Sequence, residues 1–193
     1  MKTLTPDDFH RAADTLTVDV PKVKAVAQIE APNGGFLESG EPTILFERHV
    51  FSNRTQGRFD ATHPHISNQT PGGYGPTSAQ HGRLAEAAKL DRTAALESAS
   101  WGKFQIMGFN HQTAGYMTLQ GFINAMYESE GKQLDAFVSF LKNDRGGAMQ
   151  RALKAADWET FARLYNGPAY AKHNYHGRLR AAYTALAKGA AHG

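Results

Sequence analysis

The sequence predicts a mainly α-helical fold in a single domain, residues 1–193. Apolar residues recur at intervals of three and four on both sides of an irregular middle, which is the spacing of helices with one buried face. The clear apolar run without this spacing covers residues 43–51, and it fits either a strand or a short helix. Residues 31–81 are rich in Gly, Pro, Asn, His and Ser, so we expect an irregular segment there, with a short β-hairpin as one alternative.

Two helices are expected near the N-terminus. The first carries an apolar stripe over residues 9–16, and Thr5-Pro6 supplies its cap and first turn. The second begins after Asp19, a candidate N-cap, has Pro21 in its first turn, and ends before Pro32.

Helical spacing dominates after Gly115. Expected stripes cover residues 122–126, 134–141, 158–165 and 179–186. Glycines 146 and 147 end the second of these helices, Asp157 caps the third, and the sequence Asn166-Gly167-Pro168 stops it. We expect the stripes to share one core.

Composition is that of an ordinary globular protein, with 41% hydrophobic and 20% charged residues. The chain has no cysteine, which excludes disulfides, thiol chemistry and cysteine-ligated zinc. A net charge of +3 from scattered Lys and Arg favours a mildly anionic partner, such as a bacterial cell-wall polymer, over nucleic acid. The N-terminus lacks the apolar run of a secretory signal, and no stretch is long enough to span a bilayer.

Glu30 is the most informative residue. It follows Val23, Val26 and Ala27 on one helical stripe, so its carboxyl group should lie at the end of the helix on the apolar side. Partial burial and the negative end of the helix dipole both raise a carboxyl pKa, which suits a general acid. An exposed Glu at a helix end is the alternative.

Glu47 is the second candidate carboxylate, because it lies inside an apolar run where a charge should face a pocket or pair with Arg48 or His49. A helix ending in one carboxyl group, a Gly-rich turn and a second carboxyl group together form a plausible glycosidase arrangement. Spacing along the chain leaves both the inverting and the retaining geometry open.

Two segments could hold sugars. Residues 98–108, SASWGKFQIMG, combine aromatic, hydroxyl and amide groups, and residues 165–168, YNGP, add a second aromatic and amide cluster. The alternatives are a hydrophobic core for Trp101 and Phe104, and a helix stop for the second segment.

Histidine offers the competing chemistry. His49, His63, His65, His81 and His111 could supply metal ligands, but there is no H-E-x-x-H pattern, and we expect neither a metal nor another cofactor. A G-x-S-x-G nucleophile motif is also absent.

These segments together resemble the phage-type N-acetylmuramidase endolysins, which have a lysozyme-like, mainly helical fold and cut the glycan strands of peptidoglycan. The resemblance rests on residues 44–51, 72–75, 98–108 and 165–168, and it spans about residues 18–186. The third segment is also similar to the Ser-x-Gly-x-x-Gln-Ile pattern of goose-type lysozymes and lytic transglycosylases.

The resemblance implies catalytic roles for Glu30 and Glu47 and sugar-binding roles for Trp101, Phe104, Gln105, Tyr74, Tyr165 and Asn166. In the wider group a Ser usually follows the catalytic Glu, whereas Ala31 follows Glu30 here, and Glu97-Ser98 makes Glu97 a rival for the acid. The resemblance further implies a cytoplasmic protein that reaches the wall through a holin-made lesion.

A lytic transglycosylase and a non-catalytic peptidoglycan-binding module are the alternative functions. We expect a monomer. Basic residues on the last helix, Arg178, Arg180 and Lys188, form either a solvated face or a weak contact with an anionic membrane.

Overall fold

The computed structural model describes residues 2–190, and the chain forms two compact units. We call residues 1–33 together with 129–193 the terminal unit, and residues 34–128 the central unit. Each unit is described separately, and the prediction of a single domain therefore stays a prediction.

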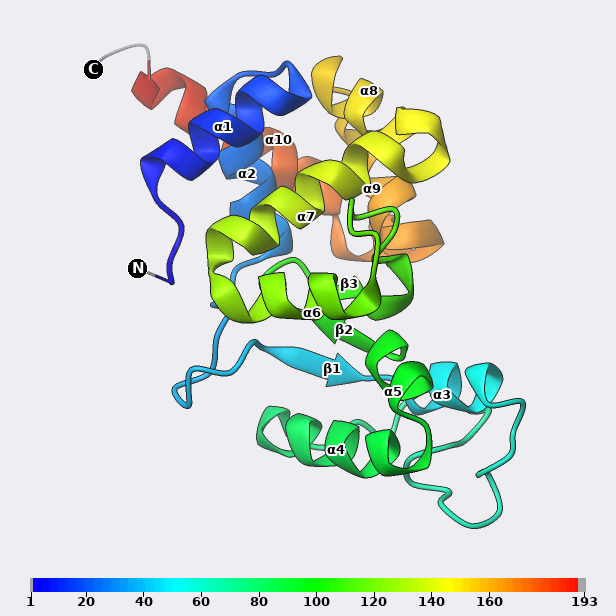
Figure 1. Ribbon diagram of the computed structural model, residues 1–193. Helices are drawn as coiled ribbons and strands as arrows, with labels where there is room; N and C mark the ends of the chain where they lie inside the picture. Colours follow the sequence, from blue (N-terminus) through cyan, green and yellow to red (C-terminus); the bar gives the residue numbers. More distant parts are fainter. Residues whose placement is uncertain (1, 191–193) are drawn as a thin grey trace. The chain divides into compact units, whose positions relative to one another are not determined.

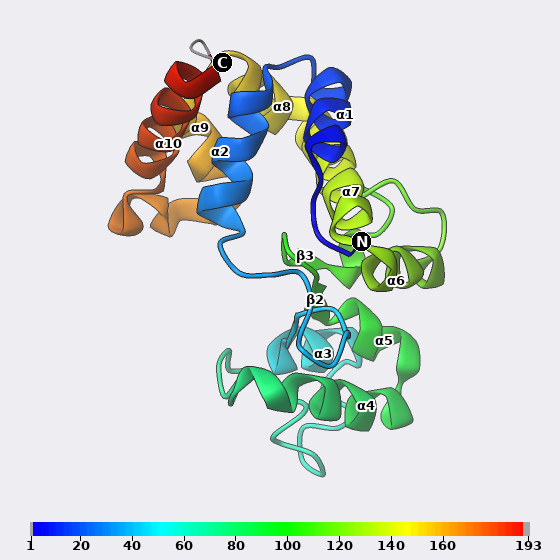
Figure 2. The same ribbon diagram turned by 90° about the vertical axis from the view of Figure 1, so that its left-hand side faces the viewer.

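The terminal unit is helical (Figure 1). Its α-helices are α1 (Pro6–Leu16), α2 (Val20–Glu30), α7 (Glu130–Asn143), α8 (Ala148–Lys154), α9 (Trp158–Asn166) and α10 (Tyr175–Ala190), with the 3-10 helices η3 (Asp144–Gly147) and η4 (Gly167–His173) between them. Helix α10 packs against α2 and α9, while α1 packs against α2 and α7 (Figure 2). Buried side chains from these helices, including Leu16, Val26, Phe137, Phe161 and Leu179, form the core.

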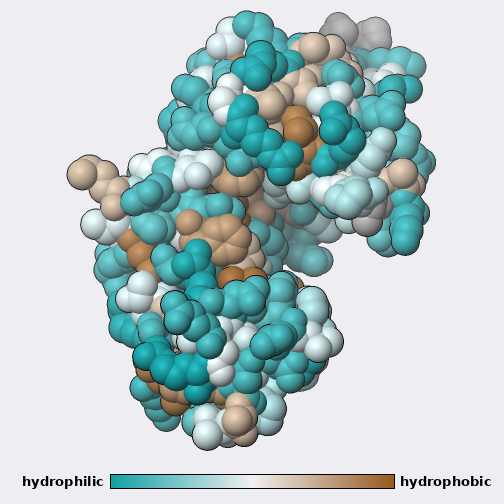
Figure 3. Space-filling model, turned by 90° about the vertical axis from the view of Figure 1, so that its right-hand side faces the viewer, coloured by the Kyte–Doolittle hydropathy of each residue, from teal (hydrophilic) through white to brown (hydrophobic). Residues whose placement is uncertain are grey.

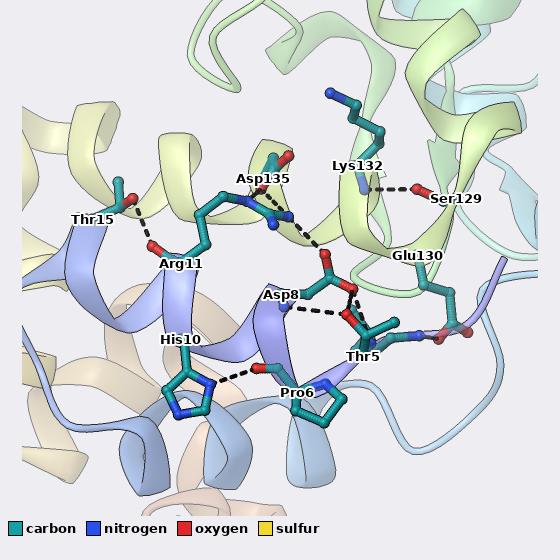
Figure 4. Close-up of polar contacts among 11 residues, drawn as sticks. Thr5, Pro6, Asp8, His10, Arg11, Thr15, Ser129, Glu130, Lys132 and Asp135 are labelled. Atoms are coloured by element: carbon teal, nitrogen blue, oxygen red, sulfur yellow. Dashed lines mark hydrogen bonds and ion pairs between the residues drawn. The ribbon is translucent and has the colours of Figure 1, made fainter. Parts of the chain in front are cut away.

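Side-chain caps fix the ends of these helices where the sequence predicts them. Thr5 and Asp8 form a capping box, Asp19 accepts from the Lys22 backbone N–H, and Asp157 accepts from that of Thr160. Asp8 also accepts from Arg11, which reaches across to Asp135 of α7 (Figure 4). The first helix is thereby fixed to α7 by polar contacts as well as by its apolar stripe.

The central unit is built on a small antiparallel sheet in the order β1-β2-β3. The strands are β1 (Ile44–Phe46), β2 (Ala99–Trp101) and β3 (Ile106–Met107), with Ile44 opposite Trp101 and Ser100 opposite Met107. Helices α3 (Arg48–Arg54), α4 (Gln80–Leu90), α5 (Arg92–Glu97) and α6 (Leu119–Glu128) accompany the sheet, together with η1 (Thr77–Ala79) and η2 (Gly108–Asn110). Phe46, Phe51, Trp101 and Phe122 are among its largest buried side chains.

The prediction of a mainly α-helical fold with a small β element is confirmed. For the apolar run 43–51 the sequence fits either a strand or a short helix, and the structure has both. The run forms the strand β1, then Glu47, then the start of the helix α3. The irregular segment contributes β1 and an isolated antiparallel bridge between Phe36 and Pro42, while β2 and β3 form a short hairpin outside it. The sequence does not predict helices α4, α5 and α8, because Ala-rich or interrupted apolar stripes give little periodic signal.

Most of the face drawn in Figure 3 is hydrophilic, with scattered apolar residues. Within residues 2–190, no helix combines the length and the apolar character that crossing a membrane requires.

Candidate active site

Glu30 is the last residue of α2, and its side chain is partly buried. The amide of Asn166, the last residue of α9, donates a hydrogen bond to Glu30 Oε1 at 3.1 Å. Burial raises the pKa of Glu30, while the Asn166 hydrogen bond and the positive charge of Arg178 on α10 lower it, and the pKa stays raised. A carboxyl group in this environment holds its proton more readily than an exposed one.

Tyr165 precedes Asn166 and belongs to the same cluster. Its ring contacts two phenylalanines, edge to face with Phe137 at a centroid distance of 5.5 Å and stacked with Phe161 at 6.0 Å. Burial, followed by the charges of Glu30 and Tyr175, raises the pKa of Tyr165, so its hydroxyl stays protonated. We call Glu30, Tyr165, Asn166, Tyr175 and Arg178 the terminal half-site.

Glu47 lies between β1 and α3, at the N-cap position of α3. Its backbone N–H donates to the Ser98 carbonyl at 2.9 Å, which ties it to the start of β2, and its side chain is only 16% exposed. Glu47 Oε2 lies 3.2 Å from Nδ1 of His49, and the two buried atoms are not aligned as a hydrogen bond. The arrangement is an ion-pair contact whenever the imidazole carries a proton.

Tyr74 completes the surroundings of Glu47. Burial raises the pKa of Tyr74, and a hydrogen bond to the Glu47 carboxylate raises it further. The tyrosine therefore acts as a neutral donor toward Glu47. We call Glu47, His49 and Tyr74 the central half-site.

A glycine-rich loop carries Tyr74. Gly72, Gly73 and Gly75 all have positive φ, a conformation that L side chains rarely adopt. Arg48 fixes the loop from α3, because its Nε donates to the Thr70 carbonyl at 3.0 Å and its guanidinium covers Gly73. A Cβ at position 73 would lie 2.7 Å from Arg48 Nη1, so a side chain there would have to displace the Arg48 guanidinium in addition to adopting a positive φ.

Gln105 is exposed in the turn between β2 and β3, with a positive φ of 49°. Its amide donates to the Gly102 carbonyl at 2.8 Å and accepts from the Ser100 hydroxyl at 2.6 Å. The side chain is thus held in one orientation on the sheet that contains β1, and it stays accessible to a ligand.

Trp101 and Phe104 are 1% and 2% exposed, and the indole N–H of Trp101 donates to the Leu96 carbonyl at 3.1 Å. Their burial matches the hydrophobic-core alternative from the sequence. Stacking on a sugar requires an exposed ring face, so we leave these two residues out of the proposed sugar contacts.

Glu97, the rival for the acid, forms an ion pair with Arg54. The Arg54 guanidinium engages the Glu97 carboxyl group, whereas the Glu30 carboxyl group is partly buried and bonded by a neutral amide. Glu30 is therefore the stronger candidate.

Three of the histidines that could have supplied metal ligands contact different partners. His65 contacts Glu86 at 2.7 Å, the His81 ring lies 2.8 Å from the Pro42 carbonyl, and His49 faces Glu47. Within the described part of the chain, no group of three or more His, Cys, Asp or Glu side chains is placed to hold a metal ion.

No local pattern in the sequence predicts that Arg48 holds the glycine-rich loop or that the charge of Arg178 acts on Glu30. Arg178 is exposed on α10, in agreement with the solvated face that the sequence predicts as one alternative, and its charge also acts on Glu30. Asn166, a predicted sugar contact, also donates a hydrogen bond to the candidate acid. A cation or amide that acts across helices leaves no local pattern, so only the fold reveals such partners.

Comparison with known proteins gives a consistent result. A family model described as N-acetylmuramidase matches residues 19–187. The solved structure of an endolysin from Burkholderia AP3 phage is similar to this chain with a TM-score of 0.92 and 41% sequence identity, covering 98% of this chain and 72% of that one. No match was found among curated proteins.

Proposed function

Since the chain belongs to the N-acetylmuramidase family and is a peptidoglycan-hydrolysing endolysin, we propose that Glu30 is the general acid of its glycosidase reaction. The proposed bond is the β-1,4 linkage between N-acetylmuramic acid and N-acetylglucosamine. The observation that carries the assignment is the position of the Glu30 carboxyl group, which is partly buried at the C-terminal end of α2 and bonded by Asn166, and burial there raises its pKa.

In the proposed reaction, protonated Glu30 donates its proton to the glycosidic oxygen as the bond to the N-acetylmuramic acid carbon breaks. The developing positive charge on the sugar ring requires a nearby carboxylate. Glu47 supplies it, stabilising that charge or orienting the attacking water. Water then completes the hydrolysis.

The environments of the two carboxyl groups suit these different roles. Asn166 donates to Glu30 through a neutral amide, so the carboxyl group keeps its orientation in both protonation states. Glu47 instead lies at the N-cap position of α3, with Nδ1 of His49 3.2 Å from its carboxylate and the Tyr74 hydroxyl as a hydrogen-bond donor.

Proposed sugar contacts are Tyr74 and Gln105 in the central unit and Tyr165 and Asn166 in the terminal unit. Gln105 has an exposed, oriented amide that could bind a hydroxyl or acetamido group. Tyr165 offers its protonated hydroxyl rather than a ring face, because phenylalanines pack against the ring.

Mass spectrometry of borohydride-reduced fragments from purified Gram-negative peptidoglycan tests the reaction. Reducible N-acetylmuramic acid ends support the proposal. Anhydro ends would instead indicate a lytic transglycosylase, in which a substrate hydroxyl replaces water. Retention on the wall without fragments would indicate a binding module.

Delivery and assembly complete the proposal. The enzyme acts on the cell wall, and we propose that it reaches the wall from the host cytoplasm after holin-mediated release, as a monomer. Arg180 and Lys188 are exposed on α10 and could give a weak contact with an anionic membrane. Co-flotation with phosphatidylglycerol vesicles, lost in the variant with both residues changed to Gln, tests that contact.

A further inference from the structure

Gln80 is a buried polar residue that the proposed reaction does not use. It is the first residue of α4 and is only 1% exposed. A buried primary amide is stable only when its acceptor and donor atoms have partners. The partners of Gln80 therefore indicate what holds the residue in place.

The Gln80 side chain bonds backbone groups around the central half-site. The Gln80 oxygen accepts from the Phe46 N–H at 3.0 Å, and its NH2 group donates to the Tyr74 carbonyl at 2.6 Å and the Pro76 carbonyl at 3.1 Å. Phe46 directly precedes Glu47, and the Tyr74 side chain bonds Glu47. One side chain thus connects the backbones that carry both members of the carboxylate and tyrosine pair.

The position of β1 explains why an amide is needed. As the first strand in the order β1-β2-β3, it pairs on one side with β2, so the Phe46 N–H on the other side would be unsatisfied without Gln80. The Gln80 side chain must also donate two hydrogen bonds to the glycine-rich loop. Only a neutral amide offers an acceptor and two donors in this geometry.

The loop needs such a fixed point because its glycines leave the backbone permissive. Arg48 holds the earlier part through the Thr70 carbonyl, and Gln80 holds the later part through Tyr74 and Pro76. We propose that Gln80 is a positioning residue that fixes Tyr74 against Glu47. This inference rests on the proposed function of the central half-site.

The test compares Gln80→Glu with Gln150→Glu in the full chain. The Gln80 change keeps the acceptor for the Phe46 N–H, but an ionised carboxylate cannot donate to the two loop carbonyls. Gln150 is the matched control, because its amide donates to the Leu16 carbonyl at 3.0 Å in the terminal unit.

We expect Gln80→Glu to lower kcat on solubilised glycan strands by roughly 10- to 100-fold with KM changed much less, as for a misplaced catalytic group. Gln150→Glu should leave kcat within about twofold, since it lies outside both half-sites.

A double-mutant cycle with Tyr74→Phe separates positioning from general stability. If Gln80 acts through the Tyr74 and Glu47 pair, Gln80→Glu should lower kcat by less than about threefold in the Tyr74→Phe background. Equal losses in both backgrounds would overturn the inference. So would a loss of kcat in Gln80→Glu that is explained by a reduced folded fraction, measured by thermal unfolding at the assay temperature.

Controls distinguish this failure from a failure of the proposed function. If Glu47→Gln and Tyr74→Phe retain full activity, the central half-site has no role, and the positioning inference fails with it. If those variants lose activity while Gln80→Glu does not, the proposed function stands and the inference about Gln80 alone is overturned.

Discussion

The two half-sites surround their carboxyl groups in opposite ways. Glu30 lies at the C-terminal end of an 11-residue helix, where burial and the helix dipole oppose negative charge and Asn166 and Arg178 offset only part of that effect. Glu47 lies at the N-cap position of a helix and has His49 and Tyr74 as neighbours. One carboxyl group therefore has surroundings that raise its pKa, while the other lies beside an imidazole and a hydroxyl donor, and such different environments suit different roles.

The largest expected effect comes from the acid. We expect Glu30→Gln to lower kcat for glycan hydrolysis by roughly 10²- to 10⁴-fold, because the amide has no proton to transfer at neutral pH. Fragment release from purified peptidoglycan measures the loss. Activity near that of the natural sequence would remove Glu30 from the reaction, and Glu97→Gln would then test the rival acid.

The second carboxylate should matter less. Glu47→Gln keeps the size of the side chain but removes the charge that the ring cation needs, and we expect a loss of about 10²-fold in kcat. His49→Gln serves as the partner variant, with a smaller loss because the carboxylate remains. If Glu47→Gln lowers kcat as much as Glu30→Gln or more, the prediction that the acid contributes most to the rate is wrong.

Adjacent glycines allow a matched test of the central loop. Gly73→Ala and Gly72→Ala both force a side chain into positive φ, at a cost of about 1–2 kcal/mol each in the free energy of unfolding. Only Gly73→Ala also displaces Arg48, since nothing lies within 4 Å of a Cβ at position 72. We therefore expect similar losses of stability by chemical denaturation but a larger loss of kcat for Gly73→Ala. Equal activities would show that Arg48 does not matter for the loop.

The terminal half-site predicts a pH effect. The Asn166 hydrogen bond and the Arg178 charge both lower the pKa of Glu30, so Asn166→Ala and Arg178→Gln should each raise it. Glu30 then stays protonated to higher pH, so the basic limb of the profile of kcat against pH moves to higher pH. Arg180→Gln, an exposed change on the same helix, is the control and should leave the limb in place.

The smallest effect concerns stability. The pKa of Glu30 is higher in the folded state than in the unfolded state. Its contribution to the free energy of unfolding is therefore complete below the unfolded pKa, near 4.5, and is lost as pH rises through the higher folded value. Replacing the carboxyl group with an amide removes this loss. The Tm of Glu30→Gln should therefore exceed that of the natural sequence at neutral pH, with a difference that shrinks toward acid. A constant difference across pH would indicate that ionisation of Glu30 is not its source.

Local sequence was enough to predict several helices and the candidate acid. Caps at Thr5, Asp19 and Asp157 act within three or four residues, so their geometry follows from the residues themselves. The position of Glu30 on the stripe of α2 follows from helical periodicity in the same way. Its proposed function as an acid could thus be inferred before any fold was known.

The sequence determined by itself that α2 ends in a carboxyl group on its apolar side and that Glu47 interrupts an apolar run, because periodicity and composition act over short range. Only the tertiary structure decided which groups surround them. Asn166 lies 136 positions from Glu30, and Gln80 lies 34 positions from Phe46, so these contacts depend on helix packing and strand pairing rather than on any local pattern. The same packing buried Trp101 and Phe104, whose residue types alone fitted a sugar-binding wall equally well.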